Sequence, residues 1–426
     1  YLAALNGITA GGGYEMALAC EEIVLVDDGH SAISLPEVPL LGVLPGTGGL
    51  TRVVDKRKVR RDLADIFCTL AEGVKGQRAV DWRLVDAIAP KSRFDALVAR
   101  RLADLAARSP VRGGDGIVLT PLMPEISENS MAYSHVSVEI DRAARTATLT
   151  LRGPADDPPA SPPSLRQAGA GTYLLRLFRE MDDALLRLRF NEPEIGLFLL
   201  KTTGDPQGVV AHDSALASLA KDDWLAREIV LLMGRTLRRL DVTARSLFAL
   251  VEPGSCFAGS LLETALAADR TYGLDDPDQP VELQLSPLNF GALPMVHGPS
   301  RLSLRYLSDP ERVVRLHEKV ASGSGVRFSV GEAEEAGLVT VAADVLDYGD
   351  EIRVAMEERA SLSPDALTGM EASLRFPGTE SMESKVFGRL SAWQNWIFQR
   401  PNAVGETGAL KTYGKPERPV FDWRRT

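Results

Sequence analysis

The chain has 426 residues, of which 45% are hydrophobic and 25% are charged, and its formal net charge is −10. This length indicates two to three domains with buried cores. The acidic balance argues against nucleic acid as a partner, because phosphate binding needs a basic surface. No apolar run reaches the length of a transmembrane helix, so a membrane is not an expected partner either.

The cysteines and histidines show no pattern of a disulfide framework or a metal site. The three cysteines are far apart and odd in number, which favours free thiols in a reducing, cytoplasmic environment: Cys20, Cys68 and Cys256. The five histidines have none of the spacings that zinc sites use: His30, His135, His212, His297 and His317. We therefore expect neither a metal nor another cofactor.

The first part of the chain alternates short apolar runs with amphipathic ones, which indicates an α/β fold. The expected elements are, in chain order, a strand at 1–5, a helix from 14 to about 22, strands at 21–28 and 31–35, a loop rich in proline and glycine at 36–49, and helices at 52–72, 76–87 and 93–108.

After a segment rich in glycine and proline, alternating strand patterns begin again. The expected elements are strands at 136–141 and 146–151, a proline-rich insertion at 153–164, a helix at 171–190, a strand at 195–202, a helix at 221–242, a strand at 247–253, and a mostly helical tail from 364 with an extended, charged end.

Three segments return in the same order about 250 positions later, which predicts two copies of one fold. The first copy contains "AALNGITAGGGYEMALACEEIVLV", "SLPEVPLLGVLPGTGG" and "GQRAVDWRLVDAI". The second contains "FALVEPGSCFAGSLLETALAADRTYGL", "LSPLNFGALPMVHGPS" and "SVGEAEEAGLVTVA". The pairs that set the alignment, separated by 247, 251 and 254 positions, are Gly7 with Gly254, Pro36 with Pro287 and Val85 with Val339.

This repeat sets the expected domain boundaries. They are 1–109 for the first copy, 110–134 for a connector, 135–350 for the second copy and 351–426 for a helical C-terminal region with an extended tail. Six residues precede the glycine match in the first copy, whereas roughly 120 precede it in the second. We therefore expect that the first copy is truncated at its N-terminus and that a longer reading frame exists.

Three consecutive glycines, Gly11 to Gly13, run directly into the first expected helix. A helix N-terminus exposes unpaired N–H groups, and glycine lets a ligand oxygen approach them, so an oxyanion site is one interpretation. A tight turn or close packing is the other.

Two glutamates lie near these glycines in the sequence. Glu15 follows in the first helical turn, and Glu37 follows a later strand. Two carboxylates on separate rigid elements can hold a water and act as acid and base. Taken singly, Glu15 could instead stabilise the helix dipole, and Glu37 could be a solvated loop residue.

The two glycine- and glutamate-bearing blocks together resemble the crotonase (enoyl-CoA hydratase/isomerase) superfamily. The matching patterns are NG-x-x-x-GGG-x-E and PE-x-x-x-G-x-x-P-G-x-GG, in the same order and spacing. The resemblance implies tandem crotonase-spiral domains and an acyl-CoA substrate. It further implies that Gly12 gives one oxyanion N–H, that Glu15 and Glu37 are the catalytic pair, and that Gly46 lines the pocket beside their water. The other oxyanion N–H and much of the CoA contact would precede Tyr1.

The second copy departs from this pattern. "GGGYE" is replaced by "AGSLLE", which shifts Glu263 by one place, and the second glutamate is replaced by Leu288. "PGTGG" is replaced by "PMVHG". We therefore expect that the second copy has lost the chemistry and remains as a packing partner.

The doubled architecture, the glutamate pair and the tail resemble a branch of the superfamily that opens an aromatic-derived ring. This resemblance implies a carbon–carbon lyase that cleaves the 2,3-epoxide or dihydrodiol of benzoyl-CoA hydrolytically, releases formate and leaves an unsaturated semialdehyde CoA thioester. The alternatives are an ordinary enoyl-CoA hydratase or isomerase, a relative acting on other cyclic acyl-CoAs, and a non-catalytic acyl-CoA-binding module. The paired carboxylates argue against the last, because binding alone does not need them. A homodimer is expected by the same resemblance.

Overall fold

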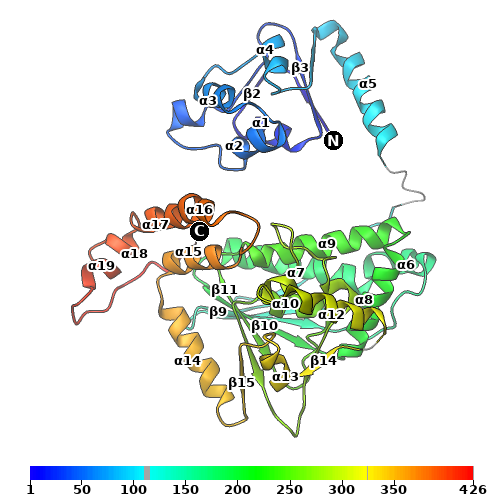
Figure 1. Ribbon diagram of the computed structural model, residues 1–426, viewed down its shortest axis with the longest axis vertical. Coiled ribbons are helices and arrows are strands. Elements are labelled where there is room, and N and C mark those ends of the chain that lie inside the picture. The colour runs from blue at the N-terminus through cyan, green and yellow to red at the C-terminus, as the bar shows by residue number, and fades with distance from the viewer. Residues whose placement is uncertain (110–115, 324, 426) are drawn as a thin grey trace. The chain divides into compact units, whose positions relative to one another are not determined.

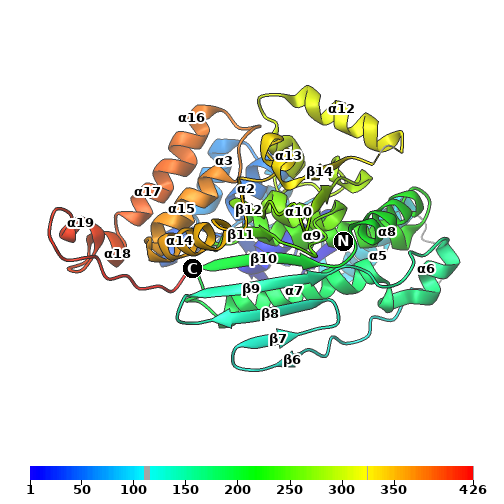
Figure 2. The ribbon, with the colours of Figure 1, turned by 90° about the horizontal axis from the view of Figure 1, so that it is seen from below.

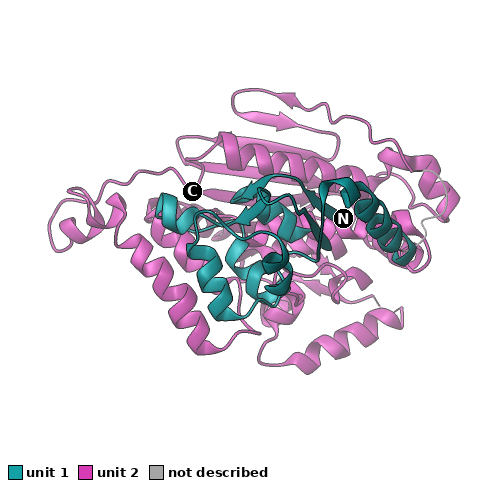
Figure 3. Ribbon diagram, turned by 90° about the horizontal axis from the view of Figure 1, so that it is seen from above, with its two compact units in different colours: residues 1–114 teal, residues 115–426 magenta. Residues whose placement is uncertain are grey.

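In the computed structural model the chain divides into two compact units, residues 1–114 and 115–426, which Figure 3 distinguishes by colour. The structure describes residues 1–109, 116–323 and 325–425. Among the helices in these ranges, none combines the length and apolar character that a membrane crossing requires.

Unit 1 is built from short strands and helices in alternation (Figure 1). Its elements are β1 (Leu2–Leu5), β2 (Ile8–Ala10), α1 (Gly12–Ala19), β3 (Glu22–Val26), β4 (Ala32–Ser34), the π-helix η1 (Glu37–Leu41), α2 (Gly49–Thr51), the π-helix η2 (Arg52–Lys56), α3 (Arg61–Thr69), α4 (Gln77–Asp81), β5 (Ala87–Ala89) and α5 (Lys91–Arg108).

Unit 1 contains two small parallel sheets. β1, β3 and β5 form one parallel sheet in that order, and β2 pairs with β4 in parallel. Side chains alternate along β3: Ile23 and Leu25 pack in the core with α1 and α3, whereas Val24 and Val26 pack with Phe94 of α5. The α/β class expected from the sequence is confirmed.

Unit 2 is larger. Its elements are β6 (Glu125–Ile126), β7 (Ser130–Ala132), β8 (Val136–Asp141), β9 (Thr146–Arg152), α6 (Pro162–Ala168), the 3-10 helix η3 (Gly169–Gly171), α7 (Tyr173–Asn191), β10 (Leu197–Thr203), α8 (Pro206–Leu219), α9 (Trp224–Asp241), β11 (Ser246–Val251), α10 (Gly259–Ala267), β12 (Arg270–Leu274), β13 (Glu282–Gln284), the 3-10 helix η4 (Pro287–Asn289), α11 (Arg301–Arg305), α12 (Pro310–Ala321), β14 (Arg327–Ser329), α13 (Val330–Glu335), β15 (Val341–Ala343), α14 (Tyr348–Ser361), α15 (Pro364–Leu374), α16 (Met382–Lys385), the π-helix η5 (Val386–Leu390), α17 (Ser391–Ile397), α18 (Pro401–Val404) and α19 (Ala409–Thr412).

An eight-stranded mixed sheet forms the centre of unit 2, in the order β15-β12-β11-β10-β9-β8-β7-β6. Figure 2 shows β10 to β6 side by side. The strands from β9 to β15 run parallel, whereas β6 to β9 pair antiparallel. Along β11, Leu247, Ala249 and Val251 pack in the core with α7 and α9, while Phe248 and Leu250 pack against α14. Both faces are covered, which explains the unbroken apolar run of this strand.

The two units share strand registers at the positions that the sequence repeat pairs. β1 pairs with β3 from Leu2–Glu22 to Leu5–Leu25, and β11 pairs with β12 from Phe248–Arg270 to Val251–Gly273. The pairings of β3 with β5 and of β12 with β15 match in the same way. The N–H groups of Leu84 and Val85 donate to the Ala79 carbonyl, just as those of Leu338 and Val339 donate to that of Ala333. These matches lie in the first and the third segment of the sequence repeat.

Two of the expected helices are shorter than the sequence pattern indicates. The helix expected at 76–87 ends at Asp81, because Arg83 adopts a left-handed φ of 63° and turns Leu84 and Val85 into the core before β5 begins. The helix expected at 52–72 is divided into η2 and α3 near Lys58, which also has a positive φ. The pattern of apolar residues continues through both turns, so periodicity alone did not separate them.

Other segments contain structure that the sequence analysis did not expect. The loop predicted at 36–49 contains η1 and α2. α8 was not predicted, although Asp205 caps its N-terminus and Pro206 is its first residue. Within the expected connector, residues 110–115 lie outside the described residues, and β6 and β7 extend the sheet of unit 2.

Candidate active site

The first of the three glycines shapes the turn in front of α1. Gly11 is the N-cap residue and has a left-handed φ of 55°, and its N–H donates to the Ser34 carbonyl at 3.0 Å. A Cβ at this position would lie 2.7 Å from Oε1 of Glu37. Glycine is therefore required here both by the backbone conformation and by the carboxylate of Glu37, which lies against the turn.

Gly12 presents an open N–H at the start of α1. It is exposed, and a Cβ at this position would meet no atom within 4 Å. The first N–H groups of an α-helix have no acceptor within the helix, and they lie at the positive end of its dipole. Gly12 can therefore donate to an oxyanion that forms in front of the helix.

Glu15 is fixed by a backbone donor from a different element. The residue is only 6% exposed, and its Oε1 accepts a hydrogen bond of 2.7 Å from the N–H of Gly49, the first residue of α2. A Cβ on Gly49 would lie 3.0 Å from this oxygen and 2.9 Å from Cβ of Pro45. The small size of Gly49 thus lets α2 approach and orient the Glu15 carboxylate.

The Glu37 carboxylate lies with its Oε1 against the Gly11 turn and has a second, buried oxygen without a partner among the described residues. Glu37 is the first residue of η1, directly after Pro36, and is half-buried. Its Oε2 is buried and has no hydrogen-bond partner among the described residues. An unsatisfied buried acceptor is unfavourable by about 1–3 kcal/mol, so this oxygen is well suited to accept a hydrogen bond from a water or a substrate hydroxyl.

Gly46 leaves space in the turn that leads into α2. It is exposed, and a Cβ here would approach only the Leu44 carbonyl, at 3.7 Å. The turn ends at Gly49, so it connects Gly46 with the residue that holds Glu15.

The structure therefore places Gly12, Glu15 and Glu37 around the first turn of α1, with Gly46 on the adjoining turn. The sequence analysis did not assign a role to Gly11 or to Gly49. The signal for Gly49 was present, because it is the last glycine of the motif "PGTGG". That motif alone does not say which side chain needs the space.

A Gly49→Ala substitution is expected to lower turnover by about tenfold or more, because the added methyl group would displace the Glu15 carboxylate or Pro45. Since only a methyl group is added, thermal unfolding should change by a few degrees at most. Steady-state kinetics and a melting curve on the same preparation check this. Unchanged turnover would contradict the role of Gly49 in orienting Glu15.

The described residues contain no group of three or more histidine, cysteine, aspartate or glutamate side chains arranged to hold a metal ion. All three cysteines have free thiols. Burial raises the pKa of the Cys68 thiol to about 11 and that of Cys256 to about 11, so neither is an activated nucleophile.

In unit 2 the helix that matches α1 is α10. The N-terminus of α10 is contacted by a carboxylate from elsewhere in unit 2. Oδ2 of Asp213, on α8, accepts from the Ser260 N–H at 2.6 Å and from the Ser286 hydroxyl at 2.8 Å. A Cβ on Gly259, which has a positive φ of 47° as Gly11 has one of 55°, would lie 1.9 Å from this oxygen. Ser260, which donates to Asp213, therefore corresponds to Gly12. The Asp213 carboxylate thus occupies the place where an external oxyanion could bind.

Glu263 follows Gly259 by four positions, as Glu15 follows Gly11, so the one-place shift expected from the sequence is wrong. The carboxylate of Glu263 nevertheless binds only buried partners. Glu263 accepts from Asn289 at 2.8 Å and from Arg301 at 3.0 Å, and Arg301 also donates to both oxygens of Asp241. Burial raises the pKa of Glu263. Each oxygen of this carboxylate thus accepts a hydrogen bond from a buried side chain, and neither is available to activate a water.

The sequence and the fold are similar to those of a known class of proteins. The family model for enoyl-CoA hydratase/isomerase matches residues 1–112. An enoyl-CoA hydratase structure from Geobacillus kaustophilus aligns over 69% of this chain and 98% of its own, with a TM-score of 0.50 and 16% identity, which shows the fold alone. Fatty acid oxidation complex subunit alpha of Shewanella amazonensis is 36% identical over 112 residues, which is 15% of its own length.

Benzoyl-CoA-dihydrodiol lyase of Aromatoleum evansii is 53% identical over all 426 residues, which cover 76% of that protein. The chain therefore belongs to the benzoyl-CoA-dihydrodiol lyase family of the enoyl-CoA hydratase/isomerase superfamily. The superfamily resemblance stated from the sequence is confirmed.

Proposed function

We propose that this chain cleaves the ring of a 2,3-epoxide or dihydrodiol of benzoyl-CoA in aromatic degradation, as a carbon–carbon lyase. The full-length similarity to benzoyl-CoA-dihydrodiol lyase supports the substrate class. The observation that carries the chemistry is the free, buried Oε2 of Glu37 beside the N-terminal turn of α1, with Glu15 anchored on the same turn. No metal or other cofactor is needed for this reaction.

Each residue of the site has a distinct task in this reaction. The N–H of Gly12 donates to the thioester oxygen as that oxygen gains charge, and the thioester acts as the electron sink. Glu15, oriented by Gly49, and Glu37 hold and activate water. For the epoxide, two waters are consumed: the seven-carbon acyl group becomes a six-carbon unsaturated semialdehyde thioester, and the remaining carbon leaves as formate. Each atom of the substrate and the waters is found in these products.

The product mass distinguishes ring cleavage from ordinary hydration. Incubation with 2,3-epoxybenzoyl-CoA should give a CoA thioester with a six-carbon acyl group by mass spectrometry. An ordinary enoyl-CoA hydratase would give a seven-carbon thioester with added water, and a binding module would return the substrate unchanged. Either of these results would overturn the proposal.

We also propose that unit 2 is a second crotonase-like domain without catalytic activity. The matching registers of the two units support a common fold. Asp213 at the N-terminus of α10, and the commitment of Glu263 to Arg301 and Asn289, support the loss of the chemistry. Calorimetric titration with a non-cleavable thioether analogue of benzoyl-CoA should therefore give one site per chain. Two equal sites would contradict an inactive second domain.

Two further expectations from the sequence, a homodimer and a cytoplasmic location, stay predictions. The domain boundaries at 109, 134 and 350 stay predictions as well.

A further inference from the structure

Each unit has a short helix that starts with an arginine and ends with a second basic residue. These helices are η2, which starts at Arg52, and α11, which starts at Arg301. The last residue of each helix has the same task in its own unit. Lys56 donates to three carbonyls at the end of α1, and Arg305 donates to two at the end of α10. Arg52 therefore corresponds to Arg301.

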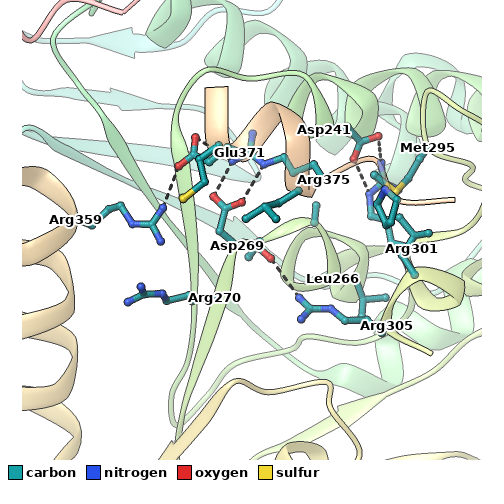
Figure 4. Close-up of a pocket in the computed structure, with 16 residues that line it drawn as sticks. Asp241, Leu266, Asp269, Arg270, Met295, Arg301, Arg305, Arg359, Glu371 and Arg375 are labelled. Carbon is teal, nitrogen blue, oxygen red and sulfur yellow. Dashed lines mark hydrogen bonds and ion pairs between the residues drawn. The ribbon is translucent and has the colours of Figure 1, made fainter. Parts of the chain in front are cut away.

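In unit 2 this arginine binds the glutamate of the matching helix. Arg301 is buried and donates to Glu263 at 3.0 Å, and it also donates to both oxygens of Asp241 (Figure 4). Glu263 is the counterpart of Glu15. The arginine of unit 2 thus neutralises the carboxylate that would have to activate water.

In unit 1 the corresponding arginine contacts the turn that leads into α2. The Nη1 group of Arg52 donates to the Thr47 carbonyl at 2.6 Å, and its backbone N–H donates to the Gly48 carbonyl at 2.9 Å. Gly48 has a left-handed φ of 105°, and a Cβ there would lie 2.6 Å from Nη1 of Arg52. The missing side chain of Gly48 therefore makes room for the guanidinium, which holds the turn.

The residue after this turn orients the catalytic carboxylate. Gly49 follows Gly48 directly, and its N–H donates to Oε1 of Glu15 at 2.7 Å. Among the described residues no cationic side chain pairs with Glu15, so this N–H is the polar group that orients it. A shift of the turn by about 1 Å would move the donor out of hydrogen-bond range.

We propose that Arg52 is a positioning residue. It holds the turn in front of α2 so that the Gly49 N–H stays on Glu15, and it points away from the carboxylate whose counterpart Arg301 neutralises. The proposal rests on the proposed function only through the role of Glu15 in activating water. It requires no contact between Arg52 and the substrate.

The kinetic test compares Arg52→Ala, Gly49→Ala and the double variant. Arg52→Ala should lower kcat for ring cleavage about tenfold and change KM by less than about twofold, because the turn orients Glu15 and does not bind the substrate. The double variant should lose about tenfold as well, since both changes act on one hydrogen bond, whereas independent effects would multiply to about a hundredfold. Arg52→Lys should restore most of kcat, because an ammonium can also donate to the Thr47 carbonyl.

A second readout needs no turnover. In a chain labelled with ¹⁵N-glycine, the Gly49 amide signal is the one that Gly49→Ala removes, and its hydrogen exchange reports the bond to Glu15. Arg52→Ala should speed this exchange by at least about tenfold. Arg93→Ala, at an exposed position of α5, is the matched control and should change neither this exchange nor kcat.

Three results would overturn the role of Arg52: a wild-type kcat in Arg52→Ala, wild-type exchange of Gly49 in Arg52→Ala, or losses that multiply in the double variant. A wild-type chain that releases no formate from the epoxide would overturn the proposed function instead. The exchange of Gly49 then still decides whether Arg52 holds this N–H, so the two failures are distinguishable.

Discussion

Glu15→Gln and Glu37→Gln should each lower the rate of ring cleavage by about a thousandfold, which corresponds to about 4 kcal/mol in the activation free energy. Glutamine keeps the size of the side chain and an oxygen that can accept from Gly49, so Glu15→Gln should still be oriented correctly. What is lost is the charge that activates water. The dissociation constant of the thioether analogue should change by less than a few fold.

Formate release and calorimetric affinity, measured on both variants, check this expectation. Glu72→Gln is the matched control, because Glu72 is an exposed glutamate of the same unit. Full activity in either Glu15→Gln or Glu37→Gln would remove that residue from the catalytic pair. Loss of binding together with turnover would instead indicate a structural role.

Asp213→Asn should remove a large pH dependence from the stability of unit 2. Burial raises the pKa of Asp213 from 3.8 to about 7, and nearby Glu263 adds to the effect. Between about pH 4 and 7 the folded state therefore binds a proton that the unfolded state has released, so stability falls as the pH rises. The total loss is on the order of 4 kcal/mol, and it is complete above about pH 7. The asparagine variant cannot ionise and should show no such loss at this position.

Urea unfolding at pH 5 and pH 8, with hydrogen exchange of α8 and α10 as the probe of unit 2, measures the difference. Burial also raises the pKa values of Asp241, Glu263 and Glu371, so the wild type will retain some slope from these groups. The difference between wild type and Asp213→Asn isolates Asp213. Asp222→Asn, at an exposed position of the same unit, should follow the wild type. Parallel profiles for wild type and Asp213→Asn would contradict the raised pKa of the buried Asp213.

Much of this architecture could be predicted from the sequence because local patterns carry it. The apolar run of β11 and the glycines before α1 identify a covered strand and an open helix N-terminus. The repeated segments predicted the residue pair Val85 and Val339, whose N–H groups make matching hydrogen bonds in the two units. The turns at Lys58 and Arg83 were missed because a left-handed residue other than glycine leaves no signal in the pattern of apolar positions.

The contacts between segments that are distant in the sequence could not be predicted from it. Nothing near Glu15 in the sequence indicates that Gly49 holds it, and nothing near Gly259 indicates that Asp213 covers it. Both contacts depend on how helices 34 and 46 positions apart pack together.

The most direct test of ring cleavage is proton NMR of formate. The chain is mixed with enzymatically prepared 2,3-epoxybenzoyl-CoA and, separately, with crotonyl-CoA. We predict one formate for each epoxide consumed and no hydration of crotonyl-CoA. Hydration of crotonyl-CoA without formate from the epoxide would contradict the account and make the protein an ordinary hydratase.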